Sequence, residues 1–202
     1  ISTDMMDAVD KGDAAQFSED EILNPTDWVL MNFIMDARTG LGRFREFKIS
    51  NYQLMMKLID ACKDQSIEDI LKMEDVAERV ALYNEHNEKA KEQIAQCATV
   101  HKNLVVLDLT QEETIYATNR FVIYAMYPDC NISIHKMWGL KKQNVVFAIG
   151  KSITNRSSNT NVGELCLKYG GGGHLNAGTC QVETSKAEAV LGELIDTITS
   201  DA

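Results

Sequence analysis

The segment from Val76 to Cys97 constrains the organisation of this chain most, because it is rich in charge and contains neither Gly nor Pro. Such a run predicts one long helix. Its apolar face becomes thin after Tyr83, so we interpret it as a solvated connector between two lobes rather than as a core helix. The sequence is therefore expected to divide into residues 1–97 and residues 98–202.

The part before this connector has the pattern of short amphipathic helices. Thr26 and Ser50 or Asn51 stand where helix N-caps are expected, and Ser66 precedes two acidic residues. Residues 17–28, with Pro25, have the composition of a loop. Helices are expected over 4–15, 27–38, from about 51 to 62, and from 66 onward.

The part after the connector alternates between strand and helix patterns. Apolar or alternating runs predict strands at 104–109, 131–138, 144–150 and 179–183. Helical patterns occupy residues 119–126, 161–169 and 186–198. The expected fold class is therefore α/β: a helical N-terminal segment and a long connector helix, followed by a small α/β domain with a mixed sheet.

Composition narrows the choice of partners. The 202 residues carry 20 Lys and Arg against 30 Asp and Glu, a formal net charge of -10. Binding a long nucleic acid needs many cationic contacts, so a small phosphate compound in a local pocket is the better expectation. No apolar run approaches the length of a membrane span, and the 5 cysteines form no CxxC. A cytoplasmic protein without a disulfide framework or a zinc knuckle is expected.

Four consecutive glycines, residues 170–173, followed by His174, are the most specific motif. Glycines are costly in conformational entropy, and they suit a loop whose backbone N–H groups approach a ligand closely. Such a loop could bind an anion such as phosphate, with His174 adding a donor. The alternative is a helix C-cap followed by a flexible turn, which would need only one glycine. The spacing fits neither a P-loop nor a dinucleotide-binding fingerprint.

A second candidate patch follows the predicted strand 144–150. Lys151 and Arg156 supply positive charge, and Ser152 and its neighbours supply hydroxyl and amide groups. Ligands of α/β sheets bind beyond the carboxyl ends of strands, so this patch and the glycine loop together predict a phosphate or nucleotide site. Taken alone, the patch is equally typical of a polar surface loop.

Aspartates at positions 4, 7, 10 and 13 form a third patch, since this spacing places them along one side of a helix. Carboxylates so arranged could bind Mg²⁺ or Mn²⁺. The alternative is a solvated acidic helix face. His86, His101 and His135 show no metal-ligand spacing, so we interpret them as surface or structural residues.

The motif GGGGH, followed by the pair Ala177-Gly178, resembles the signature of the DHH-associated C-terminal domain. The resemblance covers residues 98–202 and departs from the common pattern by one alanine. Such domains follow a DHH phosphoesterase domain. The family includes enzymes that hydrolyse short oligonucleotides, bisphosphonucleotides, cyclic dinucleotides and polyphosphate. The resemblance implies a clamp for a substrate phosphate, made by Gly171, Gly172, Gly173, His174, Lys151, Ser152 and Arg156.

The N-terminal stretch DAVDKGDAAQF resembles the end of the DHH domain, where an aspartate after a short apolar stretch binds metal. The resemblance implies Asp10 as that ligand, with Asp13 second. The sequence has no Asp-His-His triplet, so the remaining ligands of a dinuclear Mn²⁺ (or Mg²⁺) site would lie outside it. We therefore expect a hydrolase as the parent protein and an inactive chain by itself.

Two other functions stay open at this stage. One is a stand-alone nucleotide- or phosphate-binding module, which would have no need of Asp10. The other is a tRNA-contacting domain related to that of alanyl-tRNA synthetases, against which the net charge of -10 counts. Expected partners are a small phosphorylated substrate or a short single-stranded oligonucleotide. A homodimer is also expected to be possible, since residues 28–35 are apolar enough for an interface or a core.

Overall fold

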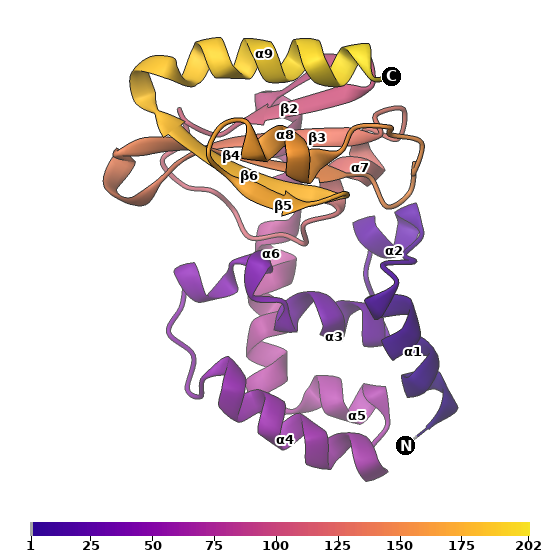
Figure 1. Cartoon of the computed structure of the whole chain (residues 1–202). Helices are drawn as coiled ribbons and strands as arrows, with labels where there is room; N and C mark the ends of the chain where they lie inside the picture. Colours follow the sequence, from indigo (N-terminus) through magenta and orange to yellow (C-terminus); the bar gives the residue numbers. More distant parts are fainter. Residues whose placement is uncertain (1) are drawn as a thin grey trace. The chain divides into compact units, whose positions relative to one another are not determined.

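The computed structural model describes residues 2–202, which divide into two compact units (Figure 1). The first unit comprises the chain up to Gln93 together with Tyr116–Val122. The second comprises Ile94–Ile115 and Ile123–Ala202. No helix in the described part of the chain is long and apolar enough to cross a membrane.

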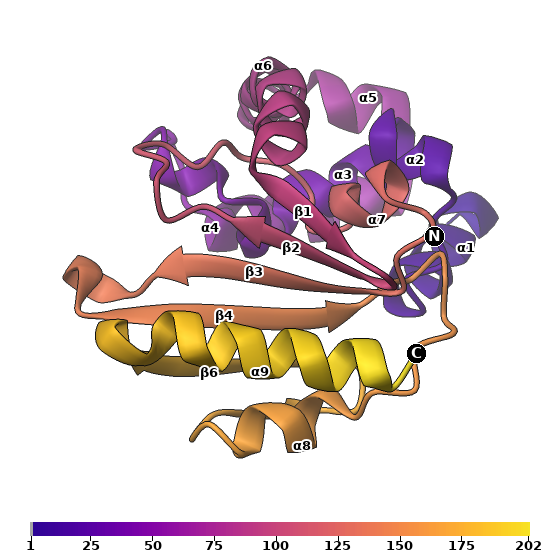
Figure 2. The same cartoon turned by 90° about the horizontal axis from the view of Figure 1, so that it is seen from above.

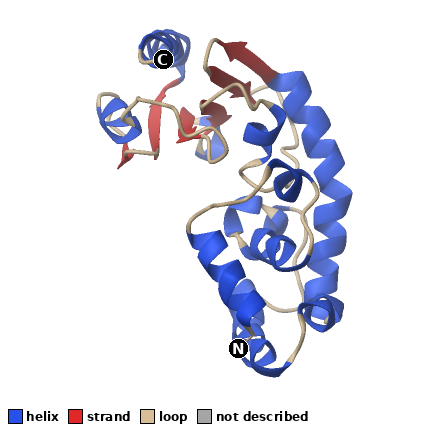
Figure 3. Cartoon of the chain, turned by 90° about the vertical axis from the view of Figure 1, so that its right-hand side faces the viewer, coloured by secondary structure: helices blue, strands red, loops and turns tan. Residues whose placement is uncertain are grey.

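The first unit consists of helices and loops, and all the strands belong to the second unit (Figure 3). Its α-helices are α1 (Thr3–Asp13), α2 (Glu19–Leu23), α3 (Asp27–Met35), α4 (Asn51–Asp64), α5 (Ile67–Lys72) and most of α6 (Glu74–Cys97), with two 3-10 turns at Ala37–Thr39 and Leu41–Arg43.

Serine caps begin several of these helices. The predicted caps Ser50 and Ser66 are confirmed, and Ser50 forms a capping box with Gln53. The prediction of a loop over residues 17–28 was wrong in its first half. Ser18 and Glu21 form a second capping box there, which begins α2, a five-residue helix. The short element lacks the repeated apolar spacing by which longer helices are predicted.

The apolar run in α3 belongs to the core of the first unit. Leu30, Met31, Phe33 and Ile34 are all buried. Phe33 packs edge-on against Phe17, with ring centroids 5.1 Å apart, and both rings contact Phe121. The alternatives for this run were core or dimer interface, and within the unit it serves the core.

Helix α6 confirms the long element, but the interpretation of it as a solvated helix was wrong. A stripe of its side chains is buried in the first unit, and after Tyr83 that stripe is mostly polar. His86 Nδ1 accepts the Ala117 N–H at 3.0 Å, and Gln93 Oε1 accepts the Tyr116 N–H at 3.2 Å. The polar side chains therefore anchor the segment 116–122, which returns to the first unit.

The second unit is a mixed six-stranded sheet with the order β1-β2-β3-β4-β6-β5. Its strands are β1 (Ala98–His101), β2 (Leu104–Asp108), β3 (Ile132–Trp138), β4 (Asn144–Lys151), β5 (Gly172–His174) and β6 (Ala177–Glu183). Within residues 2–202, only the β2·β3 pair is parallel. Figure 2 shows β1 to β4 running side by side. The α/β class with a mixed sheet is confirmed, whereas β1 and β5 are additions to the predicted strands.

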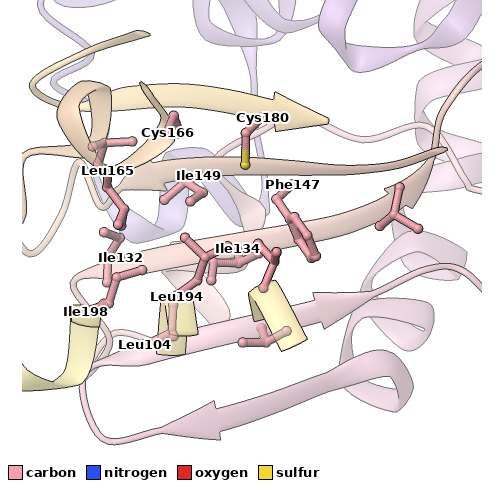
Figure 4. Packing of buried hydrophobic residues seen from close by; sticks show 14 of the residues in the cluster. Leu104, Ile132, Ile134, Phe147, Ile149, Leu165, Cys166, Cys180, Leu194 and Ile198 are labelled. Atoms are coloured by element: carbon pink, nitrogen blue, oxygen red, sulfur yellow. The ribbon is translucent and has the colours of Figure 1, made fainter. Parts of the chain in front are cut away.

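One face of this sheet carries the core of the unit. Helices α8 (Val162–Leu167) and α9 (Ala187–Ser200) cover it, while α7 (Val122–Met126) precedes β3 in the chain. Figure 4 shows the packing, in which alternate residues of β2, β3 and β4 meet the two helices. The labelled residues are Leu104, Ile132, Ile134, Phe147, Ile149, Leu165, Cys166, Cys180, Leu194 and Ile198.

Candidate phosphate-binding site

The glycine motif folds into an edge hairpin of the sheet rather than an irregular loop. β5 pairs antiparallel with β6, with His174 opposite Ala177 and Gly172 opposite Thr179. Ala177 in turn lies opposite Gly150, the second-last residue of β4. Because residues opposite each other point to the same face, His174 and Ala177 belong to the face away from α8 and α9.

Three of the four glycines have a structural reason. Gly170 has φ +76° and follows α8, and the Gly171 N–H donates to the Cys166 carbonyl at 3.0 Å, as at a glycine-terminated helix end. A Cβ on Gly171 would lie 2.1 Å from the Thr179 carbonyl oxygen. A Cβ on Gly173, whose φ is +156°, would lie 2.3 Å from the Ala177 carbonyl oxygen.

Gly172 has no such reason, since a Cβ there would meet nothing within 4 Å. β5 is the outermost strand, so it pairs on one side only and part of its backbone groups point away from the sheet. Gly172, Gly173 and His174 are all exposed. The hairpin therefore offers a small anion exposed N–H donors on a strand edge that carries no side chain before His174.

His174 has a defined orientation at the tip of this hairpin. Its Nδ1 accepts the N–H of Asn176 at 3.3 Å. A neutral imidazole that accepts at Nδ1 carries its proton on Nε2. His174 can therefore donate from Nε2 to a phosphate oxygen while its other nitrogen stays bonded to the hairpin.

The second patch adjoins the hairpin through the backbone, because the Lys151 N–H donates to the Asn176 carbonyl at 2.9 Å. Its side chains lie differently. Lys151 is opposite Ile132, so it points to the face that α8 and α9 cover, and its Nζ donates to the Ser158 carbonyl at 3.1 Å. The patch therefore shares a sheet end with His174, while the Lys151 amine is directed to its own loop.

Ser152 and Arg156 organise the loop that follows β4. The Ser152 side chain is buried, and its Oγ accepts the N–H groups of Thr154 and Asn155 at 3.2 Å and 3.0 Å. Arg156 is exposed, and its Nε donates to the Ile153 carbonyl at 3.1 Å. Of the predicted cationic pair, Arg156 is the more accessible member.

Asn131 was missed as a residue that supports this loop. Its carbonyl accepts the Ser152 N–H at 2.9 Å, and its Nδ2 donates to Ser157 Oγ at 3.0 Å. Asn103 Nδ2 donates to Asn131 Oδ1 at 2.9 Å. The only sequence signal was an asparagine at the start of the predicted strand 131–138, which is too common a feature to indicate a loop anchor.

His135 also lies in this unit, on β3, opposite Leu107 and Ala148. It was interpreted as surface or structural. It is partly buried, and burial lowers its pKa to about 4, so its imidazole is neutral near pH 7.

The predicted metal ligands Asp10 and Asp13 are exposed on α1. Within residues 2–202, no group of three or more His, Cys, Asp or Glu side chains gathers closely enough to bind a metal ion. Asp10 and Asp13 alone are too few to complete a metal centre.

Comparison with solved structures identifies the family to which the chain belongs. The pGpG-specific phosphodiesterase PggH from Vibrio cholerae is 62% identical, with a TM-score of 0.94 over 98% of this chain and 67% of that protein. An exopolyphosphatase-related protein from Bacteroides fragilis has 15% identity and a TM-score of 0.50, over 95% of this chain and 54% of its own. CDC45 from Entamoeba histolytica has 8% identity and a TM-score of 0.54, over 85% and 38%. The last two comparisons show the fold alone.

No family model and no curated protein sequence matches the chain. The glycine hairpin on a mixed sheet, the identity with the phosphodiesterase and its extent nevertheless define the class, a phosphoesterase with a DHH-associated C-terminal domain. The chain belongs to the DHH family of phosphoesterases.

Proposed function

We propose that the chain is the substrate-binding part of a DHH-family enzyme that hydrolyses a short linear dinucleotide of the pGpG type. The observation that carries this proposal is the 62% identity with a pGpG-specific phosphodiesterase over 98% of the chain. The exposed glycine edge and the oriented His174 support it, because both suit a terminal phosphate.

In this proposal the hairpin holds the terminal phosphate of the substrate. The exposed backbone edge at Gly172 and Gly173 faces the anion, and His174 donates from Nε2, while the Gly171 N–H, which donates to the Cys166 carbonyl, fixes the turn before them. Arg156 adds a positive charge from the neighbouring loop, while Ser152 shapes that loop. Lys151 contributes its charge to the same sheet end. The unit acts by positioning, since a substrate fixed at one end presents its phosphodiester in a constant place.

We further propose that hydrolysis depends on Mn²⁺ or Mg²⁺, with Asp10 as one ligand and Asp13 as the second choice. A bound divalent metal activates water and neutralises charge on phosphorus. The acidic residues of α1 support only a small part of such a site. Metal dependence, a homodimer and a cytoplasmic location stay predictions.

The proposal is tested by calorimetric titration of this chain with pGpG. His174→Ala should lose at least tenfold in affinity, because it removes a charge-assisted donor to phosphate. His101→Ala is the matched control, since His101 lies on the edge strand β1 opposite Leu104. Unchanged affinity of His174→Ala would overturn the assignment of the phosphate to this hairpin.

A stand-alone binding module is the second candidate, and the exposed glycine edge and the oriented His174 would serve it equally well. The two candidates differ in catalysis and not in the binding just described. The tRNA-contacting alternative finds no support in a net charge of -10.

A further inference from the structure

The sheet face opposite α8 and α9 carries a second histidine in line with the glycine hairpin. On β3, β4, β6 and β5 the register aligns His135, Ala148, Thr179 and Gly172 in one row across the sheet. Residues in one row point to the same face, so His135 lies on the face to which His174 also points. Ala148 and Thr179 have short side chains, so no long side chain of this row stands between the two histidines.

The His135 imidazole makes no hydrogen bond to any group in residues 2–202. By contrast, the buried His86 accepts the Ala117 N–H, and His174 accepts the Asn176 N–H. Beside His135 on the same face, the Ser133 hydroxyl is already hydrogen-bonded to Tyr124 Oη at 3.1 Å. Both ring nitrogens of His135 therefore have no partner within residues 2–202, whereas the neighbouring Ser133 hydroxyl has one.

The separation of the two histidines is set by the sheet. Three strand-to-strand steps and a shift of two residues place their backbones about 16 Å apart. This is beyond the reach of a single phosphate group, and it suits a ligand longer than a mononucleotide whose end is held at the hairpin. A neutral imidazole has one donor and one acceptor, which fit the edge of a nucleobase rather than an anion.

We propose that His135 is a specificity-determining residue that hydrogen-bonds a nucleobase of the dinucleotide whose terminal phosphate the glycine hairpin holds. This inference rests on the proposed function. It assigns the two ends of the ligand to two different residues of one sheet face, with His174 at the phosphate and His135 at a base.

The test is calorimetry of the full 202-residue chain with two probes, pGpG and its abasic analogue, which has the same phosphates and no bases. His135→Ala should lower the affinity for pGpG about tenfold and leave the affinity for the abasic analogue unchanged, since only pGpG carries the group that His135 contacts. His135→Gln, which keeps one donor and one acceptor, should recover part of the loss. His101→Ala, on the other face of the sheet, should bind both probes as the wild type does.

The outcomes separate this inference from the proposed function. If His174→Ala loses pGpG but His135→Ala binds it normally, only the role of His135 is overturned. Equal losses of both probes in His135→Ala would also overturn it, because they would indicate a structural effect. If the wild type binds neither probe, the proposed function fails and the assignment of His135 fails with it.

Discussion

At the scale of single residues, the four glycines differ in what requires them. Gly170 terminates a helix, and Gly171 and Gly173 allow β5 to approach β6 closely. The run predicted a ligand loop, with a helix C-cap and flexible turn as the alternative, because a sequence alone does not show which carbonyl a Cβ would meet. Only Gly172 is left without a packing role, so packing explains more of the motif than expected.

We expect Gly171→Ala to lower the free energy of unfolding by about 2 kcal/mol, because the new Cβ overlaps a backbone carbonyl that cannot move freely. Gly172→Ala, as the control, should change it by less than about 0.5 kcal/mol, since its Cβ meets open space. Urea denaturation of both variants measures the difference. Equal stability of the two would contradict the close approach at Gly171.

At the scale of elements, α6 shows that hydrophobic periodicity can predict a helix without predicting which of its side chains are buried. The helix itself was predicted correctly from a run without Gly or Pro. Its burial was not predicted, because the buried stripe contains polar residues whose hydrogen-bond partners lie more than twenty residues away in the sequence. These residues are His86, Asn87 and Gln93. A polar stripe facing water and a polar stripe anchoring a returning segment have the same pattern.

His86→Ala should destabilise the chain by about 1–3 kcal/mol, since it leaves the buried Ala117 N–H without an acceptor. His86→Asn, which keeps an acceptor, should recover part of that loss. Thermal unfolding monitored by circular dichroism gives both values. A His86→Ala variant as stable as the wild type would show that the anchor contributes nothing.

Acid should destabilise the chain through two histidines. Burial lowers the pKa of His86 and lowers that of His135 to about 4, below the ordinary 6.5. Both are therefore neutral when folded and take up protons on unfolding, so stability is full above pH 6.5 and falls as the pH drops toward 4. The urea midpoint should be lower at pH 5 than at pH 7, and His135→Leu should make this difference smaller. A midpoint equal or higher at pH 5 would contradict this.

At the scale of the whole molecule, the strands β2, β3, β4 and β6 were predicted from apolar runs and alternation. β1 and β5 did not, because β1 is short and directly continues a helix, and β5 contains glycines with little strand propensity. The site was predicted as a set of neighbours along the chain. The register decides which of those neighbours share a face, and it separates Lys151 from His174.

We predict that the chain by itself does not hydrolyse pGpG, because Asp10 and Asp13 would supply only part of the ligands of the proposed metal site. Incubation with Mn²⁺ and detection of GMP by chromatography provides the measurement, with Asp10→Asn as the comparison. Mn²⁺-dependent release of GMP that Asp10→Asn abolishes would contradict the prediction and place the catalytic site within this chain.

The central claim, that the glycine hairpin binds a terminal phosphate, is tested most directly by comparing pGpG with GpG, which lacks only that phosphate. We predict that the wild-type chain binds pGpG at least tenfold more tightly than GpG, and that His174→Ala binds the two nearly equally. Equal affinity of the wild-type chain for both ligands would contradict the claim.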